Sequence, residues 1–203
     1  MVEFVVVDNH SVSLGHVRPG GVVLDVGCRG FRFAEFFGRR AHQVICLDPA
    51  PNEVPPNSMN SCWYTFVRAA LVGEGGPREA YLKATEDPEA RHVVPSRVDE
   101  ADDLIRCITL PDLLSTHGIK EVELAKFNCE GSEFDILDTL SVPIKQIVVS
   151  FHEHTPQARG KENIDRLLAK FSDRYSIYNA VFEKKFGCSD NYWNVVMVIK
   201  DRI

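Results

Sequence analysis

The sequence predicts a single α/β domain, a doubly wound and mostly parallel sheet of about seven strands whose last strand is antiparallel. Strand-like and helix-like patterns alternate from residue 20 to the C-terminus, which favours helices on the faces of a sheet over a bundle or a sandwich. No helical pattern separates the last two strand-like segments, 175–182 and 192–199, so they predict a closing hairpin. A length of 203 residues fits one domain with its own core.

The first part of the chain predicts a β-α-β unit followed by a third strand. The apolar, β-branched run 21–26 predicts a strand that is buried on both faces. Apolar side chains at helical spacing within 33–40 predict a helix, and 43–47 predicts the next strand. A proline- and asparagine-rich segment, 49–56, predicts a loop before a strand at 63–67.

The segment 78–106 has the weakest pattern. Residues 80–82 predict a strand. The acidic stretches 85–89 and 99–103 predict solvated surface, because runs of like charge are usually exposed.

The second half returns to alternating helices and strands. Thr109 is placed to cap a helix, with Pro111 in its first turn and Gly118 just past its end. Strands are expected at 122–128 and 144–151, with a helix at 133–140 between them. A last helix is expected around the apolar stripe within 164–171.

Composition excludes several classes of protein. A net charge of −6 opposes attraction to phosphate backbones, so no nucleic-acid partner is expected. No apolar run reaches the roughly 20 residues of a membrane span, and the first residues lack a signal-peptide pattern. The cysteines are scattered without a C-x-x-C pair, which favours a reducing, cytoplasmic location. The oligomeric state stays open.

A glycine-bearing turn follows the first predicted strand. Residues 25–30 read DVGCRG and lead into a helix, and glycine there lets the backbone approach a ligand closely. Asp48 ends the second strand about 20 residues further on, where a carboxylate can bind the hydroxyls of a ribose. The full G-x-G-x-x-G that seats a pyrophosphate is missing, so the pattern favours S-adenosylmethionine over NAD.

Three segments in this order, 24–30, 45–49 and 124–133, resemble the signature segments of the FkbM-type methyltransferases. Residues 109–114 resemble the short helix that precedes the last segment in that family, and the similarity runs from about residue 22 to 154. The resemblance implies a class I, Rossmann-like methyltransferase with S-adenosylmethionine as cofactor and a hydroxyl acceptor. The single domain would comprise an N-terminal extension (1–20), a cofactor-binding core (20–154) and a C-terminal helix and hairpin (155–203).

The candidate cofactor-binding residues come from these segments. They are Asp25, Gly27, Cys28, Arg29, Gly30, Asp48, Pro49 and Asn128. Two positions depart from the family pattern: Asn128 stands where an aspartate is frequent, and Phe31 where many methyltransferases have glycine. Asn128 either makes a neutral contact or marks a noncatalytic relative.

Methyl transfer to a hydroxyl needs a group that aligns the acceptor and takes its proton. Ligands of open α/β sheets bind beyond the carboxyl ends of the strands, so residues 126–130 and 151–154 should face one crevice. His152 is the first candidate for the base, and Lys126 and Glu130 are the other catalytic candidates. In the alternative interpretation, the histidine only bonds the loop and Glu130 caps the helix that begins near Ser132.

No metal is expected, because His152, Glu153 and His154 lack a visible third or fourth ligand partner. The sequence therefore predicts O-methylation of a sugar or another small polyhydroxylated metabolite, by in-line transfer with a general base. A noncatalytic or regulatory protein that binds S-adenosylmethionine is the alternative. An NAD-dependent oxidoreductase fits less well, because of the closing hairpin and the missing glycine.

Overall fold

The computed structural model describes residues 2–40, 43–50, 63–83, 91–152, 161–184 and 191–200. Its helices are α1 (Arg32–Gly38), α2 (Leu110–Thr116), α3 (Ser132–Asp138), α4 (Lys161–Phe171) and the short 3₁₀ helix η1 (Leu14–His16). Its strands are β1 (Val5–Val7), β2 (His10–Val12), β3 (Val22–Val26), β4 (Gln43–Leu47), β5 (Tyr64–Val67), β6 (Ala70–Val72), β7 (Glu79–Leu82), β8 (Val93–Val94), β9 (Asp103–Thr109), β10 (Val122–Phe127), β11 (Ile144–His152), β12 (Tyr175–Lys184) and β13 (Asn191–Ile199).

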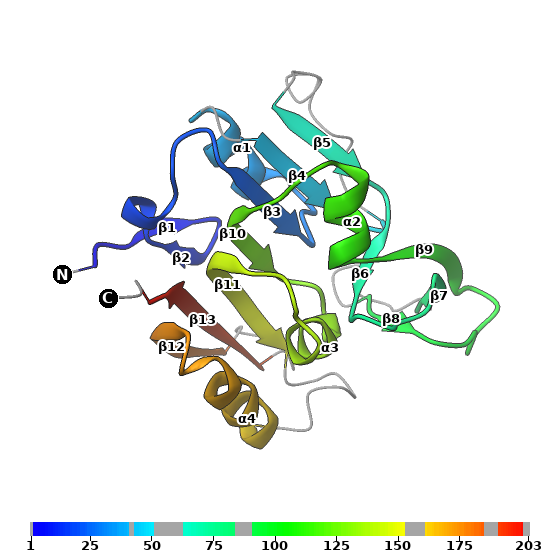
Figure 1. Cartoon of the computed structure of the whole chain (residues 1–203). Coiled ribbons are helices and arrows are strands. Elements are labelled where there is room, and N and C mark those ends of the chain that lie inside the picture. The colour runs from blue at the N-terminus through cyan, green and yellow to red at the C-terminus, as the bar shows by residue number, and fades with distance from the viewer. Residues whose placement is uncertain are drawn as a thin grey trace.

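A seven-stranded sheet runs through the molecule in the order β12-β13-β11-β10-β3-β4-β5 (Figure 1). The neighbours from β11 to β5 pair in parallel. The last strand, β13, is antiparallel to both β11 and β12. This confirms the predicted fold class, a mostly parallel sheet that closes in a hairpin.

Two apolar clusters cover opposite faces of this sheet. Successive residues of a strand point to opposite faces, so Val23 packs with α1 and the β1–β2 hairpin, whereas Leu24 packs with α2, α3 and α4. The central strands are almost fully buried on both sides, which is why their sequences are mostly apolar, with only a few buried polar residues such as Asp25 and Lys126. The sheet therefore offers a rigid platform at the carboxyl ends of β3, β4 and β10.

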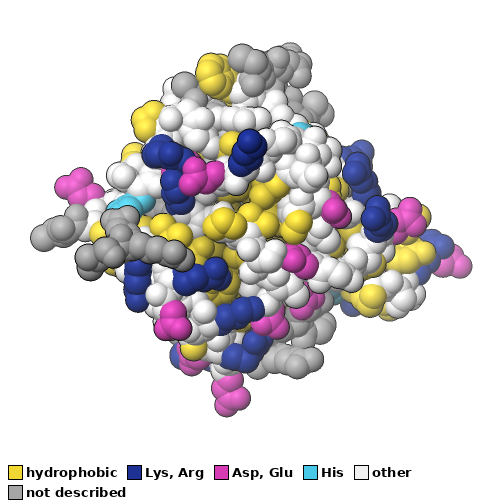
Figure 2. All heavy atoms as spheres, viewed as in Figure 1, with side chains coloured by type: hydrophobic (Ala, Val, Ile, Leu, Met, Phe, Trp, Pro, Cys, Tyr) yellow, Lys and Arg dark blue, Asp and Glu magenta, His cyan; other side chains and the backbone are white. Residues whose placement is uncertain are grey.

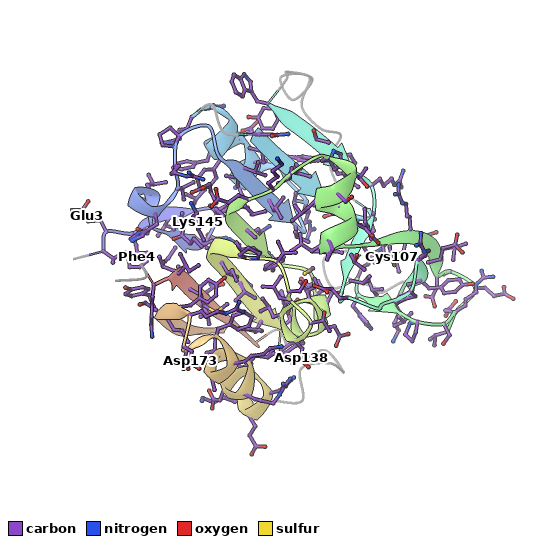
Figure 3. The ribbon with its side chains drawn as sticks, viewed as in Figure 1. Glu3, Phe4, Cys107, Asp138, Lys145 and Asp173 are labelled. Atoms are coloured by element: carbon purple, nitrogen blue, oxygen red, sulfur yellow. The ribbon has the colours of Figure 1, made fainter. Side chains whose placement is uncertain are left out.

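Several strands escaped prediction. The β1–β2 hairpin forms where an extension of no assigned structure was expected. The strand predicted at 80–82 is confirmed as β7, but the β6, β9 and β8 strands that join it in a small second sheet were not predicted. Figure 3 places Cys107, on β9 of this small sheet, across the molecule from Phe4 beside the N-terminal hairpin. Most of these strands have only two to four residues, and the longer β9 begins in the acidic stretch that was expected to be surface, so the sequence gave no usable signal for them.

The reading of 99–103 as solvated surface is wrong at Asp102. Its side chain is buried, and its Oδ2 accepts hydrogen bonds from the backbone N–H groups of Val98 and Asp99, at 2.8 and 2.9 Å. A carboxylate that folds back on its own turn in this way is satisfied without water. Residues 85–89 lie outside the described residues.

The ends of α2 agree with the prediction. The Oγ1 of Thr109 accepts a hydrogen bond from the N–H of Asp112 at 3.4 Å, as expected of an N-cap residue. Gly118 has a φ of +64°, a left-handed conformation suited to glycine after a helix. Within the part of the chain that the structure describes, no helix is long and apolar enough to cross a membrane.

Candidate functional site

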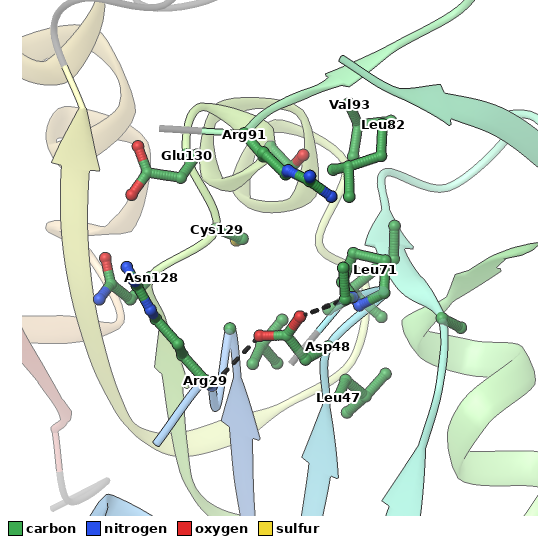
Figure 4. A pocket seen from close by; sticks show the side chains of 17 residues that line it. Arg29, Leu47, Asp48, Leu71, Leu82, Arg91, Val93, Asn128, Cys129 and Glu130 are labelled. Atoms are coloured by element: carbon green, nitrogen blue, oxygen red, sulfur yellow. Dashed lines mark hydrogen bonds between the residues drawn. The ribbon is translucent and has the colours of Figure 1, made fainter. Parts of the chain in front are cut away.

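A cavity of about 140 Å³ lies at the carboxyl ends of β3, β4 and β10 (Figure 4). These strands are neighbours in the sheet, so the segments that follow them meet at one edge. The lining residues are Val26, Gly27, Arg29, Leu47, Asp48, Pro49, Ala50, Ala69, Ala70, Leu71, Leu82, Arg91, Val93, Asn128, Cys129, Glu130 and Ser132. The cavity therefore collects predicted cofactor residues from all three signature segments.

Gly27 makes the turn after β3 with a φ of +73°. A Cβ at this position would lie 1.8 Å from the backbone oxygen of Asn128, so only glycine fits. The N–H groups of Gly27 and Cys28 donate to the oxygen of Leu47, at 2.8 and 3.3 Å, and the N–H of Asn128 donates to Val26 at 3.1 Å. The three strand ends are thus tied to one another around the floor of the cavity.

Phe31 keeps the backbone shape that glycine would favour at its position. Its φ is +57°, and its buried ring packs edge-on against Phe66 with centroids 5.7 Å apart. A left-handed non-glycine residue costs about 1–2 kcal/mol, which burial of an aromatic ring offsets. This departure from the family pattern therefore leaves the turn intact.

Asp48 presents a fixed carboxylate to the cavity. Its Oδ2 accepts the N–H of Arg29 at 3.1 Å and its Oδ1 accepts the N–H of Ala50 at 2.9 Å (Figure 4). Burial raises the pKa of Asp48, and the two backbone donors partly offset that rise. Each carboxylate oxygen can accept a second hydrogen bond, so the group fits the two hydroxyls of a ribose.

One wall of the cavity comes from the small second sheet. Leu71, Leu82 and Val93 lie on β6, β7 and β8 and give it an apolar surface suited to a purine. Together with the glycine turn and Asp48, this wall fits an adenosine-containing cofactor. Sequence reasoning missed Leu82, Val93 and Arg91, because their segment has no strong periodicity.

Asp25, Cys28, Gly30 and Lys126 do not line the cavity. The Lys126 ammonium is buried beneath the turn, where it donates to Asp25 Oδ1 at 3.0 Å and to the oxygen of Gly27 at 2.7 Å. Burial opposes the charge, but the Asp25 carboxylate outweighs it and raises the pKa of Lys126. The predicted catalytic place of Lys126 does not match this geometry, because its charge is used to hold the turn.

His152 lies at the end of β11 between two carboxylates. Its Nδ1 is 2.9 Å from Glu133 Oε1, and its Nε2 is 3.2 Å from Glu130 Oε1. Burial opposes the positive charge, but the Glu133 carboxylate and the hydrogen bonds to Glu130 and Glu133 outweigh it and raise the pKa of His152 to about 10. An imidazolium with both nitrogens protonated has no lone pair, so His152 fits poorly as a general base.

Glu130 lines the cavity, whereas Glu133 is fully buried behind it. The interpretation of Glu130 as the cap of α3 is wrong. The N-cap is Gly131, whose N–H donates to Glu133 Oε2 at 2.9 Å. Glu130 has a φ of +49°, a left-handed conformation that is strained for a non-glycine residue, and such strain is enriched at functional sites. His154 and Glu153 lie outside the described residues.

The stability of the protein is expected to depend on the charge of His152. Its pKa is higher in the folded state than in the unfolded state, so its contribution is complete below pH 6.5 and disappears as the pH rises through about 10. Between these values, the difference in free energy of unfolding between wild type and His152→Gln should shrink by about 1.4 kcal/mol per pH unit. Urea denaturation of both proteins from pH 6 to 10 measures this difference.

An NMR titration of the His152 ring provides an independent check of the same prediction. The ring should stay protonated well above pH 7 because both nitrogens face carboxylates. A midpoint near 6.5, together with parallel stability curves, would show that the imidazolium is not held by Glu130 and Glu133.

Comparison with known proteins identifies the family. The Methyltransferase FkbM domain model matches residues 25–178, well over half of the chain. A search of curated proteins gives no match.

The chain also resembles several solved structures at low sequence identity. One is the 1,6-didemethyltoxoflavin-N1-methyltransferase of Burkholderia thailandensis, with 15% identity, 91% of this chain and 72% of that chain covered, and a TM-score of 0.43. The TehB-like SAM-dependent methyltransferase of Corynebacterium glutamicum has 14% identity, coverage of 92% and 84%, and a TM-score of 0.45. An rRNA methylase of Streptococcus thermophilus has 8% identity, coverage of 92% and 91%, and a TM-score of 0.47. Likenesses at this level carry no argument about the acceptor.

The match to the family model covers the glycine turn, Asp48, Asn128 and Glu130, the same residues that meet at the cavity. The chain therefore belongs to the FkbM methyltransferase family and is an S-adenosylmethionine-dependent methyltransferase.

Proposed function

We propose that this methyltransferase acts on a hydroxyl group of a sugar or another small polyhydroxylated metabolite, with Glu130 as the group that takes the proton. One observation carries the proposal: the Glu130 carboxylate lines the cavity that also holds Asp48, and a charged histidine fixes its position. A hydroxyl acceptor requires a group that takes its proton, and a carboxylate can do so.

S-adenosylmethionine supplies a methyl group that is already activated on a sulfonium. The residues of the chain then have to align the acceptor and remove its proton. Asp48 and the Gly27 turn would hold the cofactor at the strand ends. Glu130 would take the hydroxyl proton as the acceptor oxygen bonds the methyl carbon and the carbon–sulfur bond breaks to release S-adenosylhomocysteine. The hydroxyl proton becomes strongly acidic as the new bond forms, so a carboxylate suffices as the base.

In this proposal His152 is a positioning residue. Its charged ring bridges Glu130 and Glu133, and its backbone N–H donates to Glu133 Oε1 at 2.8 Å. The Glu133 carboxylate therefore contacts both the backbone N–H and the ring of His152. Through these contacts it fixes the ring, and the ring fixes the Glu130 carboxylate. The geometry supports this role for His152 better than the role of base that the sequence alone suggested.

The proposed partners are small molecules in a cytoplasmic setting, with neither nucleic acid nor membrane among them. The net charge of −6 opposes binding to a phosphate backbone. On the face shown in Figure 2, lysine and arginine side chains are interspersed with aspartate and glutamate. Mixed charges of this kind are typical of an ordinary solvated surface.

A screen of acceptors tests the proposed function. The protein and S-adenosylmethionine are incubated with matched alcohols, amines and thiols, and release of S-adenosylhomocysteine is measured. Release that depends on hydroxyl compounds is expected. Release with amines alone would contradict the choice of hydroxyl.

The noncatalytic alternative is supported by Asn128, which lines the cavity with a neutral amide. It predicts tight binding of S-adenosylmethionine without release of S-adenosylhomocysteine in any member of the panel. The same screen therefore separates the two candidate functions.

A further inference from the structure

Arg91 is the basic residue that the small second sheet contributes to the cofactor cavity. It lies just before β8, and its side chain lines the cavity together with Leu82 and Val93. Figure 4 shows its guanidinium extending across the cavity between Glu130 and Leu82. A charged group thus stands at a wall that is otherwise apolar.

The charge of Arg91 is poorly satisfied by the described residues. Its Nε is buried and has no hydrogen-bond partner among them. Its ion pair with Asp103 spans 3.7 Å, and the carboxylate partner is 70% exposed, so solvent weakens the attraction. The side chain is 35% exposed, and with one long ion pair and one N–H that lacks an acceptor, the guanidinium keeps capacity to bind an anion.

The position of Arg91 indicates that its missing hydrogen-bond partner belongs to the substrate that receives the methyl group. In Figure 4, Asp48 lies at the strand ends, whereas Arg91 and Glu130 lie on the side of the cavity away from them. Under the proposed function, Asp48 and the Gly27 turn would hold the cofactor at the strand ends. Arg91 and Glu130 line the same cavity, so a molecule that donates its hydroxyl proton to Glu130 would share the cavity with the Arg91 guanidinium.

We propose that Arg91 binds an anionic group of the acceptor, a carboxylate or a phosphate, so that the enzyme selects acidic hydroxyl compounds over neutral ones. The assignment rests on the proposed hydroxyl methylation and narrows its substrate class to molecules such as uronic acids and sugar phosphates. The planar guanidinium can bind two oxygens of either anion at once.

Binding measurements without turnover test the assignment. Glucuronate, glucose 6-phosphate and glucose are titrated by calorimetry into the protein saturated with S-adenosylhomocysteine. At least one anionic sugar should bind at least tenfold more tightly than glucose. Arg91→Met should weaken the binding of that anion by about 10- to 100-fold. Arg91→Lys should weaken it by less, because lysine keeps the positive charge but cannot bind two oxygens at once as the planar guanidinium does. Arg106→Met, an exposed change on β9 outside this cavity, is the matched control.

Each contrary result has a definite meaning. Equal binding of glucose and the anions, no anion binding, or unchanged binding in Arg91→Met would overturn the assignment. If Arg91→Met weakens binding of S-adenosylmethionine but not of its decarboxylated analogue, the arginine serves the cofactor carboxylate and the acceptor assignment is wrong.

The proposed function can fail separately from this assignment. Anion binding that depends on Arg91, without release of S-adenosylhomocysteine from any hydroxyl compound, would refute methyl transfer to a hydroxyl while leaving the anion site in place. Methylation of neutral sugars alone would support methyl transfer to a hydroxyl and refute the binding of an anionic acceptor by Arg91.

Discussion

Glu130→Gln is expected to lower kcat by about 10²- to 10⁴-fold with little change in the affinity for S-adenosylmethionine. Glutamine has the same shape and can still accept a hydrogen bond from His152, but it cannot take a proton at neutral pH. The loss should therefore fall on the chemical step. Steady-state kinetics with an acceptor from the screen, together with calorimetry for the cofactor, separate kcat from binding.

Glu162→Gln is a suitable control, because Glu162 is an exposed glutamate in the first turn of α4. It should leave both kcat and cofactor binding unchanged. Glu130→Asp, which keeps a carboxylate on a shorter side chain, should retain part of the activity. If Glu130→Gln keeps activity within about threefold of wild type, proton transfer to Glu130 contributes too little to count as general base catalysis.

Gly27→Ala should abolish cofactor binding and lower the free energy of unfolding by about 2–4 kcal/mol. The new Cβ would lie 1.8 Å from the oxygen of Asn128, and that oxygen belongs to the backbone and cannot rotate away. The turn would have to move, and with it the link between β3 and Leu47. Urea denaturation and calorimetric titration measure the two effects.

Gly20→Ala is the control that separates the close approach of Asn128 from the left-handed backbone as the cause of the Gly27→Ala effects. Gly20 has a φ of +74°, almost the same as Gly27, but a Cβ there would meet no atom within 4 Å. This variant should lose only about 1 kcal/mol, the cost of the left-handed backbone, and should bind cofactor normally. Equal losses in both variants would show that backbone strain, not the close approach of Asn128, requires glycine at position 27.

The central strands and the cofactor side of the site could be predicted from the sequence, because each left a local signal. The strands β3 and β4 are buried on both faces and so are almost wholly apolar, with Asp25 and Gln43 as the exceptions. Gly27 and Asp48 lie at strand ends, where the order of elements alone brings them together. The cap at Thr109 is likewise set by residues three apart.

The rest depends on contacts between distant segments. Glu133 looked like an ordinary first-turn residue of a helix, yet it is buried against His152 from another strand. Lys126 looked available for chemistry, but Asp25 on the neighbouring strand pairs with it. Arg91 reaches the cavity only because the small second sheet folds over it. The spacing of apolar residues along the chain does not predict contacts of this kind, because tertiary packing determines them.

Calorimetric titration of wild type and Asp48→Asn with S-adenosylmethionine, S-adenosylhomocysteine and NAD tests the cofactor assignment most directly. Asp173→Asn is the control, an exposed aspartate far from the cavity (Figures 3 and 4). We predict that wild type and the control bind the two sulfur compounds and not NAD, and that Asp48→Asn binds them about 10- to 100-fold more weakly, because hydrogen bonds from ribose to a charged carboxylate are lost. Equal affinity in Asp48→Asn, or preferential binding of NAD by the folded protein, would contradict a cofactor site built on Asp48 and the Gly27 turn.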